Sequence, residues 1–149
     1  MDPTWILVAD NSRARIFTIE RPRGPLIEVS AHDNPDARKH ERDLVTDKPG
    51  READRGGPGR SAFEAPSAKE DSAERFAREL AGMLERGRSA GEFKRLYLIA
   101  APHFLGTLRE VLERGTRACV QQEIAKDVAH ESPERIRKQL PERLSVSLA

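Results

Sequence analysis

The chain has 149 residues, of which 37% are hydrophobic and 34% are charged, and this length favours a single domain around one core. Its 26 basic and 25 acidic residues leave a formal net charge of +1, which excludes a global polycation, so any affinity for nucleic acid must come from local clustering of cations. The single cysteine, Cys119, excludes an intramolecular disulfide framework and is expected to be a small buried hydrophobe.

Three strands are predicted in the N-terminal part. Thr4 to Ala9 is a compact run that is apolar on both faces, which predicts a central strand. Arg15 to Glu20 and Leu26 to His32 alternate in polarity and predict two more strands, joined by short turns into an antiparallel meander. Because the first apolar run is too short for a signal peptide or a membrane span, we expect a cytoplasmic protein.

A stretch rich in glycine and arginine, at about residues 44–66, follows a polar segment that could hold a short helix, Asn34 to Arg42. Its glycines and prolines oppose regular structure, so an exposed and mobile loop is predicted, with Pro49 to Ala62 as its most mobile part. Two interpretations stay open, a disordered insertion and a loop whose bare backbone and cations approach a polyanion. The candidate anion-contacting residues are Lys48, Arg51, Arg55, Gly56, Gly57, Gly59 and Arg60.

Helices alternate with strands in the C-terminal part. A capping box at Ser67 and Glu70 precedes apolar residues at three- and four-residue steps, which predicts an amphipathic helix from Ser67 to about Arg88. The apolar run Lys94 to Ala101 follows that helix, so it should return parallel to the first strand through a right-handed crossover. The other predicted elements are a helix from Pro102, a strand from about Cys119 to Ile124, and a helix beginning at Ser132 and Pro133.

The order of these elements predicts one α/β domain over residues 1–149. A mixed five-stranded sheet of order 3-2-1-4-5 with three main helices accommodates it, the first three strands being antiparallel and the last two parallel to the first. That arrangement is a ribonuclease H-like layout.

Asp10 and His103 are the candidates for a secondary site. Asp10 ends the first strand, where a metal-dependent nuclease would place a carboxylate. His103 follows a strand and opens a helix, a common place for ligand contact in α/β proteins. The favoured interpretations are a turn at Asp10 and capping or solvent exposure at His103. The histidines lack metal-ligand spacing, and the phosphate-loop, nucleophile-elbow and dinucleotide motifs do not occur, so we expect no metal and no cofactor.

The opening TWILVADNSRARIF, Thr4 to Phe17, resembles the start of the bacterial host attachment protein family, the "protein required for attachment to host cells". Pro49 to Arg51 and Gly59 to Glu64 resemble two further motifs of that family, so the resemblance covers essentially the whole chain. The family is in turn similar to the middle domain of archaeal and eukaryotic peptide-chain release factors and of Pelota-like ribosome-rescue proteins. This similarity implies a ribonuclease H-like fold with a long loop before the first long helix.

In release factors the tip of that loop is Gly-Gly-Gln, whereas the matching tip here is Gly56-Gly57-Pro58-Gly59. The resemblance therefore implies a module that binds ribosomal or transfer RNA without release-factor-type hydrolysis of peptidyl-tRNA. No residue is assigned a catalytic role, and a non-enzymatic protein is favoured. The alternative is a protein-interaction module, as a homodimer or with another protein, that acts indirectly in attachment to host cells.

Overall fold

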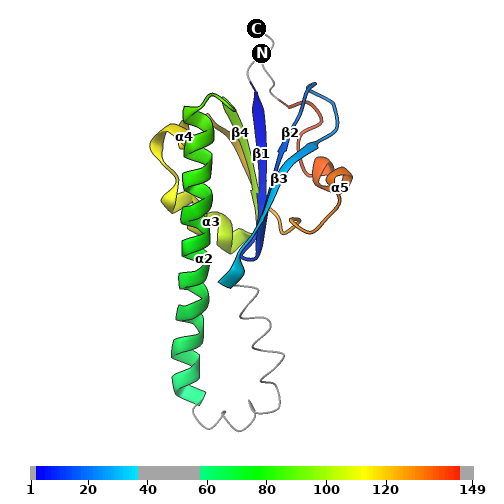
Figure 1. Ribbon diagram of the computed structural model, residues 1–149. Helices are drawn as coiled ribbons and strands as arrows, with labels where there is room; N and C mark the ends of the chain where they lie inside the picture. Colours follow the sequence, from blue (N-terminus) through cyan, green and yellow to red (C-terminus); the bar gives the residue numbers. More distant parts are fainter. Residues whose placement is uncertain (1–2, 37–57, 145–149) are drawn as a thin grey trace.

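The computed structural model describes residues 3–36 and 58–144, which form a sheet with helices on both faces (Figure 1). Five strands make one mixed sheet of order β3-β2-β1-β4-β5. The strands are β1 (Thr4–Ala9), β2 (Arg13–Thr18), β3 (Ile27–Asp33), β4 (Arg95–Ala100) and β5 (Val120–Ala125). The predicted α/β class and strand order are confirmed.

The pairing of the strands follows from their hydrophobic patterns. β1 lies parallel to β4, with Leu7 opposite Leu98, and antiparallel to β2. β5 is parallel to β4, and β3 is antiparallel to β2. The two runs that are apolar on both faces thus pair in parallel at the centre of the sheet, as predicted, because only there are both faces covered.

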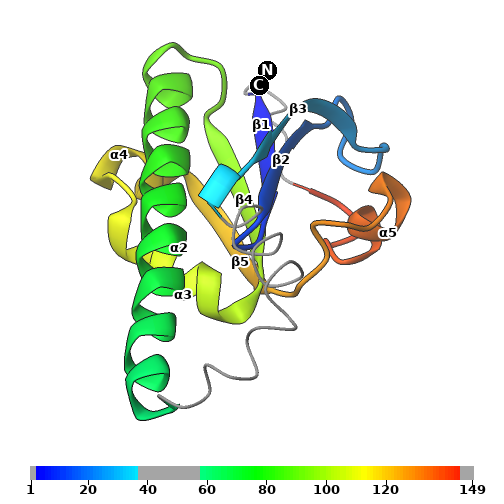
Figure 2. The same cartoon turned by 60° about the horizontal axis from the view of Figure 1, so that its bottom comes forward.

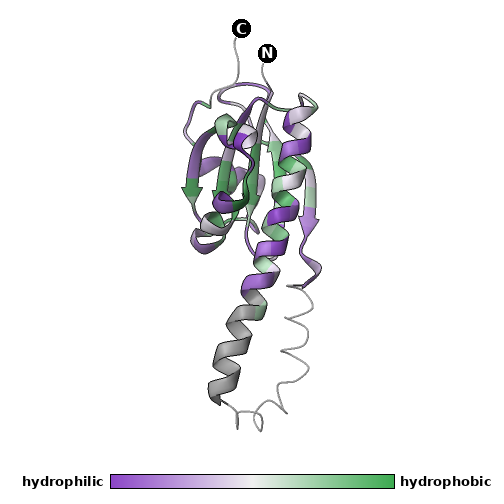
Figure 3. Cartoon of the chain, turned by 90° about the vertical axis from the view of Figure 1, so that its left-hand side faces the viewer, coloured by the Kyte–Doolittle hydropathy of each residue, from purple (hydrophilic) through white to green (hydrophobic). Residues whose placement is uncertain are grey.

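Four helices are described, α2 (Pro58–Ser89), α3 (Pro102–Val111), α4 (Arg114–Cys119) and α5 (Pro133–Lys138). α2 and α3 cover one face of the sheet, and α5 lies on the other (Figures 1 and 2). Each face has its own core, and Phe76 of α2 meets Phe104 of α3 with ring centroids 5.9 Å apart. The central strands β1 and β4 are almost wholly apolar, whereas α2 carries both polar and apolar residues along the part that is coloured by hydropathy (Figure 3). None of the described helices combines the length and the apolar content that crossing a membrane requires.

The C-terminal end of α2 is closed by a glycine cap. Gly91 has φ of 76°, its N–H donates to the carbonyl of Arg88 at 3.0 Å, and the N–H of Glu92 donates to that of Gly87 at 2.8 Å. This pair of bonds is a Schellman motif, which needs the left-handed conformation that glycine adopts without strain. Gly91 therefore ends the helix close to its predicted end at about Arg88, while Gly87 lies inside it.

Two sequence predictions about helices were wrong. α2 begins at Pro58 instead of Ser67, so the capping box does not form its start, and residues 58–66 of the predicted loop are helical. Proline suits the first helical position because its φ is preset and its missing N–H would be unpaired there anyway. The short helix α4 was not predicted, and Cys119 ends it half-buried, its Sγ donating to the carbonyl of Gly115 at 3.5 Å.

Candidate functional site

The predicted anion-contacting residues fall largely outside the described residues. Five of them lie outside the described residues, namely Lys48, Arg51, Arg55, Gly56 and Gly57. Most of the segment predicted to be mobile, Pro49 to Ala62, also lies outside them. Gly59 and Arg60 lie in the first turn of α2. We call residues 37–57, which carry most of these cations, the cationic segment. The structure fixes the two places where this segment joins the described chain, near the end of β3 and at the start of α2.

Where β3 ends, buried polar side chains tie the chain to α2. The side-chain N–H groups of Asn34 donate to the carbonyl of Asn11 at 2.8 Å and to Oγ of Ser72 at 3.2 Å. Asp36 lies two residues further along and forms an ion pair with Arg75 at 2.7 Å. We call the four residues of these two pairs, Asn34, Ser72, Asp36 and Arg75, the stem clamp.

Beyond the stem clamp, α2 continues past the end of the sheet (Figure 1). The 14 residues from Ser72 back to Pro58 correspond to a helix length of roughly 21 Å at 1.5 Å per residue. The helix start, with Gly59 and Arg60, therefore lies away from the sheet (Figure 1). A segment attached there and at the stem clamp can meet a surface that the core does not touch.

Asp10 lies in the β1–β2 turn, and its carboxylate stabilises that turn. Its Oδ1 accepts the N–H groups of Ser12 at 2.8 Å and of Arg13 at 2.9 Å, and its own N–H donates to the carbonyl of Arg13 at 2.9 Å. The interpretation of Asp10 as a turn residue is confirmed, and the tight turn lets β2 begin at Arg13, two residues before the predicted start. Among the described residues, no group of three or more His, Cys, Asp or Glu side chains is placed to hold a metal ion.

His103 is exposed in the first turn of α3, as one of the two interpretations of it expected. Asp10 and His103 follow neighbouring parallel strands, whose last residues Ala9 and Ala100 are register partners, so both lie at the same edge of the sheet. His103 lines a pocket of about 330 Å³ between α2 and α3, together with Glu70, Glu74, Arg78, Thr107, Glu110 and Val111. Arg78 neutralises Glu74 through an ion pair at 2.7 Å, so the pocket offers a mixed polar surface without a recognisable catalytic pair.

Sequence reasoning missed a second cluster on the opposite face of the sheet, between the β2–β3 turn and α5. It contains Arg23, Arg137 and Lys138. Arg23 and Arg137 are more than a hundred positions apart in the chain, so no local pattern could have joined them. The only local hint is the concentration of basic residues in Arg135, Arg137 and Lys138 at the last turn of α5.

A family model described as "Protein required for attachment to host cells" matches residues 5–140. None of the curated proteins compared with the chain matches it. Among solved structures, the chain is similar to the Ppx/GppA phosphatase of Aquifex aeolicus (type II variant), with 13% identity and a TM-score of 0.41. That similarity covers 83% of this chain but only 35% of the phosphatase, so the chain spans about a third of its length.

Proposed function

Because the chain belongs to the family of proteins required for attachment to host cells, we propose that it serves that phenotype indirectly, as a cytoplasmic module that binds ribosomal or transfer RNA. The observation that carries the proposal is where the described parts of the chain meet the two ends of the cationic segment. The segment leaves the sheet at the stem clamp and rejoins the chain at the start of α2, which extends past the sheet edge. Arginine and backbone N–H groups presented there can contact phosphates without any catalytic side chain.

We also propose that the domain is ribonuclease H-like and related to the middle domain of release factors. The sheet order and the long helix after a glycine-rich segment support this relation. Gly56 and Gly57 are followed by Pro58, which opens α2, where release factors carry glutamine. The proposed function therefore contains binding only, with no hydrolysis of peptidyl-tRNA and no enzymatic step.

Ribosome co-sedimentation across a salt series tests the proposal. Replacing Arg51, Arg55 and Arg60 together by alanine should remove most of the pelleting and lower the steepness of its salt dependence by about 1 for each phosphate that is no longer neutralised. The matched control replaces three exposed arginines elsewhere, Arg21, Arg86 and Arg114, and should leave pelleting unchanged. Pelleting that is absent at low salt, or equally sensitive to both triple variants, would reject RNA binding by this segment.

The alternative function, a protein-interaction module, is favoured by one observation. Ile27 and Val29 are 42% and 52% exposed, and both belong to β3, the edge strand whose outer side is unpaired within the sheet. An open edge with apolar side chains is suited to pairing with another strand, including that of a second copy. This function predicts association that tolerates salt and is lost in Val29→Lys, an outcome opposite to that of the RNA-binding proposal.

A further inference from the structure

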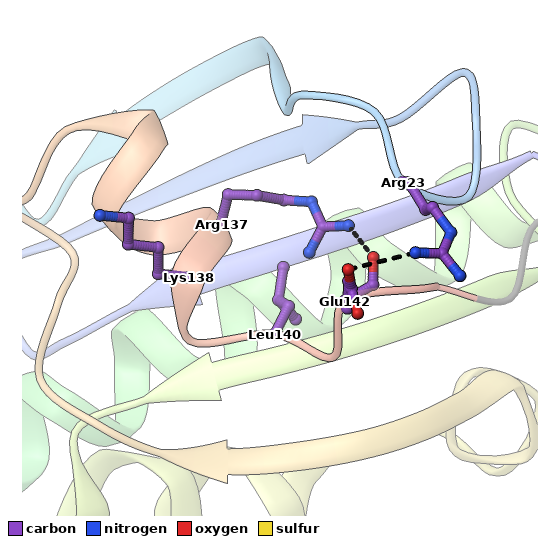
Figure 4. A pocket seen from close by; sticks show the side chains of 5 residues that line it. All are labelled: Arg23, Arg137, Lys138, Leu140 and Glu142. Atoms are coloured by element: carbon purple, nitrogen blue, oxygen red, sulfur yellow. Dashed lines mark hydrogen bonds and ion pairs between the residues drawn. The ribbon is translucent and has the colours of Figure 1, made fainter.

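A surface pocket of about 350 Å³ lies between the turn that joins β2 to β3 and the C-terminal end of α5 (Figure 4). Three cationic side chains and one carboxylate line it, with Leu140 as an apolar wall; the charged residues are Arg23, Arg137, Lys138 and Glu142. The β2–β3 turn and the stem clamp lie at opposite ends of β3, so this pocket is separate from the cationic segment.

Arg137 is held in the pocket by neutral oxygens. Its guanidinium donates to four backbone carbonyls, those of Gly24 (2.9 Å), Pro141 (2.8 Å), Glu142 (2.7 Å) and Pro22 (3.3 Å). Four of the five N–H groups of the guanidinium donate in these bonds. Among the described residues, the fifth N–H group, on Nη1, has no acceptor. Burial lowers the pKa of Arg137, and the charges of Glu142 and Tyr97 only partly oppose this effect. The side chain is thus a fixed positive charge whose direct hydrogen-bond partners carry no negative charge.

The other charges at the pocket are easily rearranged. Arg23 and Glu142 form an ion pair at 3.1 Å, but their side chains are 62% and 83% exposed, and such exposed pairs contribute little to stability. Lys138 is also exposed and follows Arg137 directly in α5. An incoming anion that displaces the carboxylate of Glu142 from Arg23 at small cost therefore contacts Arg23 and Arg137, with the charge of Lys138 nearby (Figure 4).

We propose that this pocket is a binding site for a phosphate group. Arg137 provides the oriented charge, and Arg23 faces its guanidinium from the β2–β3 turn, so that both can contact the phosphate oxygens; Lys138 points away from Arg23 and adds positive charge at the rim of the pocket (Figure 4). A tetrahedral dianion suits two facing arginines and a nearby lysine better than a single carboxylate does, because charge-assisted hydrogen bonds from arginine to phosphate are strong and directional. The phosphate group belongs to a free phosphate ion or small phosphorylated molecule, or to a nucleic-acid backbone. The site goes beyond the proposed function and does not depend on the cationic segment.

The test is a titration of the full-length, ¹⁵N-labelled chain followed by two-dimensional NMR. One arm adds inorganic phosphate against chloride at matched ionic strength, and a second arm adds a single-stranded RNA octamer. Saturable shifts should concentrate at the amides of residues 23–24, 137–140 and 142 in at least the first arm. Shifts in the RNA arm that compete with inorganic phosphate would assign the phosphate to a nucleic-acid backbone, and their absence would assign it to a small molecule.

Three exposed side chains make the test independent of folding. Glu142→Gln removes the competing carboxylate and should tighten phosphate binding about two- to fivefold, the range expected from an exposed ion pair. Arg23→Ala with Lys138→Ala should weaken it by about fivefold or more, whereas the control Arg86→Ala with Lys94→Ala, two exposed cations elsewhere, should not. Arg137 is left intact because its loss would strand four carbonyls. Absent or non-saturable shifts at these amides, or equal affinities in all variants, would overturn the proposal whether or not the chain binds ribosomes.

Discussion

Asn34 reaches from the end of β3 to Ser72 in the middle of α2, with its Nδ2 donating to Oγ of Ser72 at 3.2 Å. Asn34 is 4% exposed and Ser72 is 3% exposed, so the bond is shielded from water. The backbone N–H of Asn34 also donates to the carbonyl of Ser12 at 2.8 Å. One residue thus joins the β1–β2 turn, β3 and α2 at the point where the cationic segment begins.

The first prediction concerns this contact. Asn34→Ala should lower the free energy of unfolding by about 1–3 kcal/mol, because the carbonyl of Asn11 and the hydroxyl of Ser72 lose a buried partner. Urea denaturation followed by circular dichroism measures the change. Asn11→Ala is the control, since it removes an exposed side chain and keeps the backbone carbonyl. Equal stabilities of the two variants would show that the side chain of Asn34 does not stabilise the contact between β3 and α2.

The sheet could be predicted because its signals are local. Runs such as Trp5 to Ala9 and Leu96 to Ala101 are apolar on both faces, and a helix between them dictates parallel pairing. The start of α2 could not be predicted, because the glycines and two prolines there oppose a helix locally. Only Pro58 is compatible with one, because proline is tolerated at the first helical position. The cationic pocket was missed for another reason: Arg23 and Glu142 are 119 positions apart, and only the folded chain brings them together.

The second prediction uses two glycines of α2. A Cβ at Gly87 would lie 2.8 Å from Cη2 of Trp5, whose ring stacks on Phe93 with centroids 4.8 Å apart. Gly87→Ala should therefore destabilise the fold by about 1–3 kcal/mol, since the stacked rings must move. Gly82→Ala should instead stabilise it by up to about 1 kcal/mol, because its nearest neighbour is the flexible end of Arg86 at 3.3 Å and alanine is the better helix former.

Thermal or urea unfolding of the two variants measures whether the free energy of unfolding falls in Gly87→Ala and rises in Gly82→Ala. The fluorescence of Trp5, the single tryptophan, should change in Gly87→Ala and remain unchanged in Gly82→Ala. Gly87→Ala should cost less in a Trp5→Leu background than in the wild-type chain, because the smaller side chain makes room for the new methyl group. If both alanines shift stability in the same direction, the close approach of α2 to Trp5 does not constrain position 87.

The third prediction concerns Lys138 and Glu142, whose replacement should change the affinity of the pocket for phosphate in opposite directions. Inorganic phosphate should raise the melting temperature of the wild-type chain, since a ligand that binds only the folded state stabilises it by mass action. The rise should be larger in Glu142→Gln and smaller in Lys138→Ala. Differential scanning fluorimetry in phosphate against chloride at matched ionic strength measures it, and a rise of equal size in both variants would indicate a general salt effect.

The last prediction concerns the carboxylate that joins α2 to α4. Hydrogen bonds from Arg88 first, and then from Thr116, lower the pKa of Glu85 from 4.5 to about 2. Oε2 of Glu85 accepts from Nη2 of Arg88 at 2.5 Å, and Oε1 accepts from Oγ1 of the buried Thr116 at 2.8 Å. Because the folded state holds this carboxylate in its charged form, the group binds a proton less readily folded than unfolded.

The sign of the pH dependence follows from that difference. The stabilisation is complete above the unfolded pKa near 4.5 and is lost as the pH falls through the window down to about 2. The difference in unfolding free energy between wild type and Glu85→Gln should therefore be constant from pH 7 to about 5.5 and shrink below pH 4.5. Urea titrations at each pH measure it, and a double-mutant cycle with Arg88→Gln isolates the coupling of the two side chains. A coupling that stays constant down to pH 2 would mean that Arg88 does not hold the carboxylate of Glu85 in its ionised form.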